Sequence, residues 1–186
     1  MNLRFEVVNS STGGLARNFR VNPDSCDNHG FYEQYLMWMA YGDLTTGANT
    51  THILLDEDSE EIVGFVTLRA TSVLSEGEVT KGTPALEISV LAVNQKYEGL
   101  GFGRTLIDFS IHEAEFLHRN ILGVENIVLM ADPKSVGFYE KCGFHEIDHY
   151  TKVPQEMWNK TCVPMILRLG FGLGPSFVTD DDEEED

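Results

Sequence analysis

Short apolar stretches separated by polar segments mark the amino-terminal half of the chain. They predict a strand over Leu3–Val8, and a helix over Gly30–Tyr41 on which the large apolar side chains share one face. Those side chains are Phe31, Tyr35, Trp38 and Met39. The segments THILL and EIVGFVTLRA then flank the polar turn DEDSEE, a pattern typical of an antiparallel hairpin.

The second half changes to longer apolar runs separated by helical periodicity. The run ALEISVLAV (Ala85–Val93) predicts a strand buried on both faces. A helix over Gly103–Arg119 follows, with an inner stripe of Leu106, Ile107, Ser110, Ile111, Ala114 and Leu117. After it come a strand NIVLMA, a short helix Lys134–Lys141 stopped by Gly143, and strands near Phe144–Tyr150 and Val163–Leu169. Early hairpins followed by strand–helix–strand units predict an α/β fold around a mixed sheet.

The composition of the chain predicts its domain boundaries and its cellular compartment. The 186 residues, 42% of them hydrophobic, are enough for one core, so we expect a single domain over 1–169 and a flexible Gly-rich and acidic tail over 170–186. The chain has no apolar run of 18 residues and no signal-peptide pattern, which predicts a soluble, non-exported protein without a membrane partner. Its three scattered cysteines encode neither a disulfide framework nor a thiolate zinc site, which favours the cytoplasm.

The charge balance bears on partners. The net charge is −17, and the final segment DDDEEED contributes seven negative charges, which leaves −10 for the rest of the chain. Because Lys and Arg supply most of the affinity for phosphate backbones, this balance argues against a tightly held nucleic acid. An acidic surface concentrates cationic amines instead.

Three closely spaced glycines, Gly99, Gly101 and Gly103, separate the buried strand from the long helix. A tight turn without a ligand is one interpretation. A dinucleotide fingerprint would need its third glycine at Arg104, with Asp132 as the ribose acid, and a P-loop would need G-K-[ST]. The third interpretation is an anion site, in which the consecutive N–H groups at a helix start surround a pyrophosphate.

Two motifs in this region resemble those of the GNAT N-acetyltransferase superfamily. The segment EGLGFG (Glu98–Gly103) is similar to the acetyl-CoA signature [QR]-x-x-G-x-[GA], with Glu98 in place of Gln or Arg. About 30 residues on, DPKSVGFYEKCGF resembles the segment N-x-x-A-x-x-F-Y-x-x-x-G-F, with Asp132 and Ser135 in place of Asn and Ala. Together, the two motifs favour the anion site over a ligand-free turn or a dinucleotide fold.

The resemblance implies a largely antiparallel sheet with splayed central strands, flanking helices and acetyl-CoA as co-substrate. The strand Leu91–Val93 would pair with the pantetheine arm through backbone groups. The implied cofactor-binding residues are Leu91, Ala92, Val93, Glu98, Gly99, Leu100, Gly101, Phe102, Gly103, Arg104, Asp132 and Ser135.

Acetyl transfer also requires a proton for the departing thiolate and a neutral amine. Tyr139 occupies the position that the resemblance gives to the general acid, and a packed amphipathic tyrosine is the alternative. Glu87 is the candidate base, because it alternates with Ser89 and Leu91 onto one strand face. A solvated strand-end glutamate explains it equally well, and an α-amino acceptor would hardly need a base.

The segment HEIDH (His145–His149) spells the H-E-x-x-H of zinc proteases. That motif binds zinc on a helix, whereas a strand is predicted here and would separate the two histidines by about 13 Å. We therefore expect no metal site.

The sequence predicts an N-acetyltransferase whose acceptor is a primary amine of a small molecule or peptide. The alternatives are a GNAT-type toxin that acetylates aminoacyl-tRNA, which the amino-terminal half resembles, and a non-catalytic CoA-binding module. The sequence leaves the oligomeric state open, a homodimer included.

Overall fold

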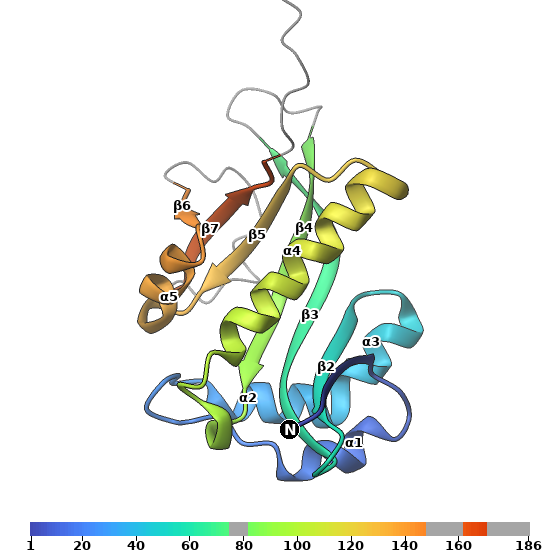
Figure 1. Ribbon diagram of the computed structural model, residues 1–186. Coiled ribbons are helices and arrows are strands. Elements are labelled where there is room, and N and C mark those ends of the chain that lie inside the picture. Colours follow the sequence, from blue (N-terminus) through green and yellow to red (C-terminus); the bar gives the residue numbers. More distant parts are fainter. Residues whose placement is uncertain (75–81, 148–161, 171–186) are drawn as a thin grey trace, which may run out of the picture.

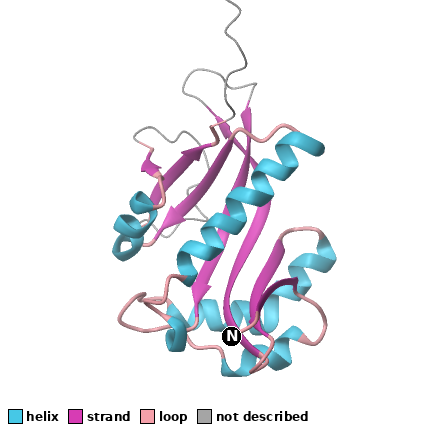
Figure 2. Ribbon diagram, in the orientation of Figure 1, coloured by secondary structure: helices cyan, strands magenta, loops and turns pink. Residues whose placement is uncertain are grey.

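The computed structural model describes residues 1–74, 82–147 and 162–170. A seven-stranded sheet with the order β1-β2-β3-β4-β5-β7-β6 forms its centre (Figures 1 and 2). The strands are β1 (Leu3–Val7), β2 (Thr50–Asp56), β3 (Glu61–Leu74), β4 (Gly82–Val93), β5 (Asn126–Ala131), β6 (His145–Glu146) and β7 (Val163–Arg168). Only β4 and β5 pair in parallel among the described strands, so the predicted mixed, mostly antiparallel sheet is confirmed.

Helical segments cover both faces of the sheet. One face carries α4 (Phe102–Asn120) and α5 (Val136–Lys141), which follows the short η4 (Pro133–Ser135). The opposite face carries the segments that lie before β2 in the chain: α1 (Thr12–Leu15), η1 (Ala16–Asn18), α2 (His29–Gln34), η2 (Tyr35–Met39) and α3 (Ala40–Thr46). Figure 1 shows α4 crossing the sheet diagonally, with α5 beside β5 and the early helices gathered at one end.

The predicted stripe on the long helix is confirmed. Leu106, Ile107, Ser110 and Ala114 are buried, and the apolar members pack with residues of β3, β4 and β5 in one hydrophobic cluster. The Ser110 hydroxyl donates to the Leu106 carbonyl at 2.8 Å, which satisfies a polar group that would otherwise be costly to bury.

The predicted apolar face over Gly30–Tyr41 is wrong. Tyr35, Leu36 and Ala40 are buried, whereas Trp38 is 76% exposed and Phe31 and Met39 are about half exposed. The segment Tyr35–Met39 is a π-helical turn, which inserts an extra residue and shifts the phase of the helix that a 3.6-residue period assumes.

The central strands diverge, as the family resemblance implied. The pairing of β4 with β5 runs from Ala85 and Asn126 only to Ile88 and Leu129, and the rest of β4 continues without β5. Between the pairs Leu68–Ile88 and Thr67–Val90, the register of β3 and β4 shifts, which leaves Ser89 as the extra residue of a β-bulge. The divergence leaves one edge of the end of β4 without a strand partner in the described sheet.

The bulge changes which side chains share a face. Leu86 and Ile88 pack toward α4, and after the bulge Leu91 and Val93 take that side, while Val90 and Ala92 pack against the early helices. Glu87, between Leu86 and Ile88, therefore points to the face opposite Leu91. The expectation that Glu87, Ser89 and Leu91 alternate onto one face is wrong, because the bulge interrupts the period of two.

Several predicted boundaries fall outside the described residues. His145 and Glu146 form β6, with His145 paired to Ile166, which agrees with the expected strand at this point, and His149 lies outside the described residues. Of the predicted tail over 170–186, residues 171–186 also lie outside the described residues. Within the described ranges, no helix is long and apolar enough to cross a membrane, and no group of three His, Cys, Asp or Glu side chains could hold a metal ion.

Candidate active site

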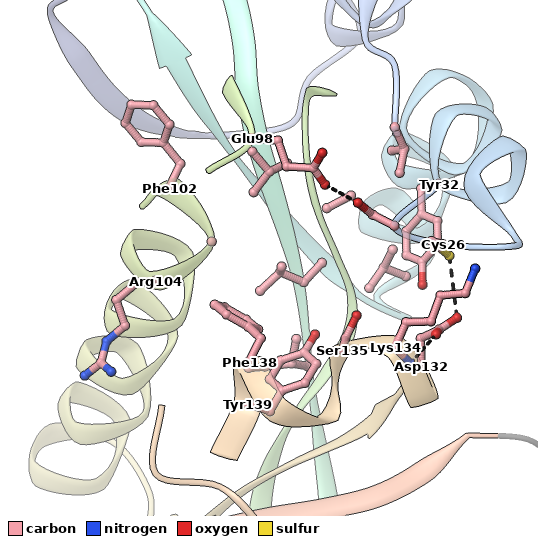
Figure 3. Close-up of a pocket in the computed structure, with 18 of the residues that line it drawn as sticks. Cys26, Tyr32, Glu98, Phe102, Arg104, Asp132, Lys134, Ser135, Phe138 and Tyr139 are labelled. Atoms are coloured by element: carbon pink, nitrogen blue, oxygen red, sulfur yellow. Dashed lines mark hydrogen bonds between the residues drawn. The ribbon is translucent and has the colours of Figure 1, made fainter. Parts of the chain in front are cut away.

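A cavity of about 690 Å³ opens where β4 and β5 diverge. Its wall combines the end of β4, the glycine turn, the start of α4, the end of β5, α5 and the loop before α2 (Figure 3). Most of the predicted cofactor residues line it: Leu91, Ala92, Val93, Glu98, Gly99, Gly101, Phe102, Gly103, Arg104, Asp132 and Ser135. Leu100 does not line the cavity, and its side chain is 65% exposed.

The glycine turn owes its shape to two residues with positive φ. Gly99 has φ +76° and Gly101 has φ +91°, a region that side chains disfavour, and Gly101 is the N-cap of α4. A glycine cannot cap with a side chain, so the first N–H groups of α4 have no side-chain partner from Gly101. Because this turn lines the cavity, it leaves backbone donors for an anion, which fits the pyrophosphate of coenzyme A.

Gly103 serves packing rather than the turn. A Cβ atom at this position would lie 3.2 Å from the Cζ of Phe138 on α5. The first aromatic residue of the Phe-Tyr pair therefore sits directly against the start of α4. Of the three glycines that the sequence singles out, two shape the turn and the third lets the two helices approach.

Glu98, which replaces the family's Gln or Arg, ties the glycine turn to the early loop. Its carboxylate accepts from the Asn22 amide and from the Ser25 hydroxyl, each at 2.6 Å. Sequence reasoning missed these two partners, because they lie more than 70 residues away along the chain. In this chain, the Glu at position 98 is therefore explained by the two hydrogen bonds that it accepts from the early loop.

Arg104 points away from the middle of the cavity in Figure 3. Its guanidinium pairs with Asp108 at 2.8 Å and donates to the Lys141 carbonyl at 3.2 Å, at the end of α5. The side chain thus joins α4 to α5, and a cofactor contact of Arg104 stays a prediction, now for its backbone N–H.

Tyr139 lies on α5 with only 9% of its surface exposed, and it lines the cavity. Burial, followed by the nearby Cys142 and Asp132, raises the pKa of its phenol, so the hydroxyl keeps its proton at neutral pH. Within the described residues, this hydroxyl makes no hydrogen bond. A protonated donor inside a cavity, with no hydrogen-bond partner in the described part of the chain, is suited to donate a proton to a bound molecule.

Glu87 lies outside the cavity lining. Its carboxylate forms a bidentate pair with Arg69 on β3, with both hydrogen bonds at 2.9 Å. Ser89 lines the cavity, and its hydroxyl donates to Glu87 at 3.4 Å. Glu87 could therefore reach an acceptor only through an intermediary, and its role as a base stays a prediction.

Sequence reasoning also missed the wall opposite α4. Val21, Asp24, Ser25 and Cys26 come from the loop before α2, and Tyr32 comes from α2 itself. Cys26 is buried, and its Sγ lies 3.7 Å from Oδ2 of Asp132. No spacing in the segment VNPDSCD signals this contact, since Asp132 is 106 residues away.

Comparisons with known proteins agree with this geometry. Residues 17–144 match the Acetyltransferase (GNAT) family. The fold is similar to the crystal structure of AtaTR bound with acetyl-CoA (TM-score 0.72, 16% identity, covering 90% of this chain and 94% of that one). It is also similar to a tyrosine-to-phenylalanine mutant of KacT (TM-score 0.71, 13% identity, covering 91% and 96%).

A third solved structure is AtaT complexed with acetyl-methionyl-tRNAfMet (TM-score 0.69, 15% identity, covering 88% of this chain and 94% of that one). The TM-scores establish a shared fold, and at such low sequence identities they establish nothing further. The family match, which spans more than half of the chain, together with the glycine turn and the buried tyrosine, shows that this protein belongs to the GNAT family of acetyltransferases.

Proposed function

We propose that this acetyltransferase transfers the acetyl group of acetyl-CoA directly to a primary amine, with Tyr139 as the general acid. The observation that carries the proposal is the buried Tyr139 side chain, which lines the same cavity as the N–H groups of the glycine turn. The turn fits the pyrophosphate, and the open edge of β4 offers backbone groups to an extended pantetheine arm.

Acetyl-CoA supplies the activated acyl group, as a thioester. The side chains of this protein would then manage protons and position. The Tyr139 phenol donates its proton to the departing sulfur, and the amine loses a proton as the amide forms. The tyrosine regains a proton from solvent, so one thioester and one ammonium ion give one amide, one thiol and one released proton.

Two versions of this function differ in the acceptor amine. The acidic surface favours a cationic small molecule or peptide amine, because the net charge outside the final seven residues is still −10 (−17 less the −7 of the tail). The resemblance to AtaT, solved with acetyl-methionyl-tRNAfMet, favours the α-amine of an aminoacyl-tRNA. Both acceptors present a primary amine to the same cavity.

An acceptor profile tests the proposal. Purified protein and acetyl-CoA are offered polyamines, amino acid amides, peptides and charged tRNA, and thiol release and product mass are measured. Acetylation of any primary amine that depends on the Tyr139 hydroxyl supports the function. Acetylation of charged tRNA alone, at near-physiological salt, replaces the small-molecule version with the aminoacyl-tRNA version. Absence of thiol release with every acceptor contradicts both.

A further inference from the structure

The end of the cavity away from the glycine turn is built from three separate parts of the chain. Cys26 comes from the loop before α2, Tyr32 from α2, and Asp132 from the end of β5, next to η4. Figure 3 shows Cys26 and Tyr32 on the side opposite α4, with Asp132 below them and Tyr139 beside the middle of the cavity. The cofactor motif accounts for none of the early-loop residues.

The two cations in the described cavity wall already have carboxylate partners outside the lining. Arg104 pairs with Asp108 at 2.8 Å, and Lys134 pairs with Asp27 at 2.6 Å. Their positive charges are therefore largely compensated before any ligand enters.

Two carboxylates of the same wall have only neutral hydrogen-bond partners. Asp132 accepts from the Lys134 backbone N–H at 2.9 Å and contacts the Cys26 thiol at 3.7 Å. Glu98 accepts from an amide and a hydroxyl, and within the described residues neither carboxylate forms an ion pair with a cation. The described cavity wall therefore holds two carboxylates that no cation pairs with directly, although the Lys134 ammonium lies near enough to Asp132 to interact with its charge.

These two carboxylates come from different elements of the cavity wall, and they contact the adjacent residues Ser25 and Cys26 of the early loop. Glu98 adjoins Gly99 in the glycine turn, whereas Asp132 lies near Tyr139, close enough for its charge to help keep that phenol protonated. A cationic group next to Asp132 would thus stand beside the predicted general acid. The burial of Cys26 and the raised pKa of its thiol leave that side of the carboxylate uncharged.

We propose that Asp132 binds the ammonium group of the acceptor, so that this end of the cavity selects a protonated primary alkylamine. This inference rests on the proposed function and names its acceptor site. Cys26 and Tyr32 form the wall along which the carbon chain of the amine lies. After the ammonium loses one proton to water, the neutral amine still donates a hydrogen bond to Asp132, and its lone pair is free to attack the thioester carbon.

Substitution of Asp132 by Asn tests this site with leucinamide as the probe. The Asn side chain keeps an oxygen for the Lys134 N–H, so the local turn is retained. At pH 6.5, where an α-amine is mostly protonated, calorimetry on the CoA-bound protein should show leucinamide binding weakened about tenfold or more, as for a lost hydrogen bond to a charged group. The affinity for acetyl-CoA should stay within about twofold, because the backbone of the glycine turn is unchanged.

Glu115→Gln on α4 is the matched control, since it removes the same charge from outside the cavity lining, where Glu115 pairs with Arg119. It should leave leucinamide binding unchanged. 4-Methylpentanamide, which is leucinamide without its amine, should bind the wild-type and D132N proteins equally. Thermal melting verifies folding, and Asp132→Ser, which also retains an oxygen near the Lys134 N–H, replaces D132N if the latter does not fold.

Three outcomes would overturn the inference. D132N could weaken acetyl-CoA as much as leucinamide, which would return Asp132 to the cofactor site that the family motif implies. D132N could leave both affinities unchanged, or E115Q could weaken leucinamide as much as D132N does. Failure of the proposed function is a separate result, since it would appear as absent thiol release even where leucinamide binds through Asp132.

Discussion

The two ends of the cavity are built in different ways. The glycine turn is one continuous segment, Glu98–Arg104, and its chemistry comes from backbone N–H groups whose directions depend on two positive φ angles. The opposite end joins Cys26, Tyr32 and Asp132, and its chemistry comes from side chains that the fold brings together across a separation of 106 residues.

This difference explains why one end is expected to be common to the family and the other to vary between its members. A backbone site tolerates changes of neighbouring side chains, so a common cofactor can be bound by distant relatives that share few residues. A side-chain site changes with each substitution, so the acceptor is specific to the individual protein. The family match therefore identifies the reaction, whereas the acceptor depends on the site that we propose at Asp132.

The largest effect is expected from a substitution in the glycine turn. Gly101→Val should abolish measurable acetyl-CoA binding in calorimetry, because a β-branched residue at φ +91° is strained and forces the turn to change shape. Apart from its two chain neighbours, no atom of the described residues lies within 4 Å of the added Cβ, so the strain comes from the backbone angle. Gly42→Ala, in α3 with similar open space and no positive φ, should bind acetyl-CoA normally. Unchanged affinity in Gly101→Val would remove the anion site from the turn.

Tyr139→Phe tests whether the phenol hydroxyl between the two regions is the general acid. Loss of the hydroxyl should lower kcat about a hundredfold or more and leave acetyl-CoA binding almost unchanged. Thiol release measures turnover, and calorimetry measures binding. Equal turnover of the two proteins would reduce Tyr139 to a packing residue.

The pH dependence sharpens the same assignment. Burial raises the pKa of the Tyr139 phenol above its ordinary value of 10.0, so the acid form persists through neutral and mildly alkaline pH. Turnover should therefore rise with pH as the acceptor amine loses its proton, and show no decline below about pH 10. A loss of activity between about pH 7 and 9, with the protein still folded by circular dichroism, would contradict a phenolic acid.

A smaller effect is expected at Glu87. If this carboxylate accepts the amine proton through Ser89 or water, Glu87→Gln should reduce turnover at about pH 7 by about tenfold. The deficit should disappear above the pKa of the acceptor, where no base is needed. Arg69→Met is the control for the ion pair: an equal deficit in this variant would make the pair structural rather than catalytic.

The smallest effect is expected from Cys26→Ala at the acceptor end. The variant removes the thiol that contacts Asp132 but leaves its carboxylate, so amine binding should weaken by only a few fold and acetyl-CoA binding should stay the same. Calorimetry with leucinamide measures the difference. A loss as large as that of D132N would move the main contact from the carboxylate to the thiol.

The parts of the fold that local patterns encode were predictable. The β2–β3 hairpin follows from two apolar runs that flank the polar turn DEDSEE, and the α4 stripe follows from a regular period of 3.6 residues. The glycine turn was predictable because the positive φ of Gly99 and Gly101 requires that residue type. Gly143, which ends α5 at φ +95°, belongs to the same class.

The rest depended on irregularities and distant contacts. The π-helical turn at Tyr35–Met39 changed the phase of the helix, so Trp38 became exposed where a regular period buries it. No pattern in the sequence marks that turn. The contacts of Glu98 with Asn22 and of Cys26 with Asp132 form only when the early loop folds over the end of β4 and β5, so spacing along the chain could not reveal them.

The β-bulge at Ser89 makes the length of β4 as consequential as its composition. One extra residue sends Leu91 and Val93 to the α4 face and Val90 and Ala92 to the other. Deletion of a single residue there would exchange the faces of every later side chain up to the glycine turn, whereas deletion of two would preserve them. Relatives that acquire insertions or deletions in this strand are therefore expected to keep an activity only when the parity of its length is conserved.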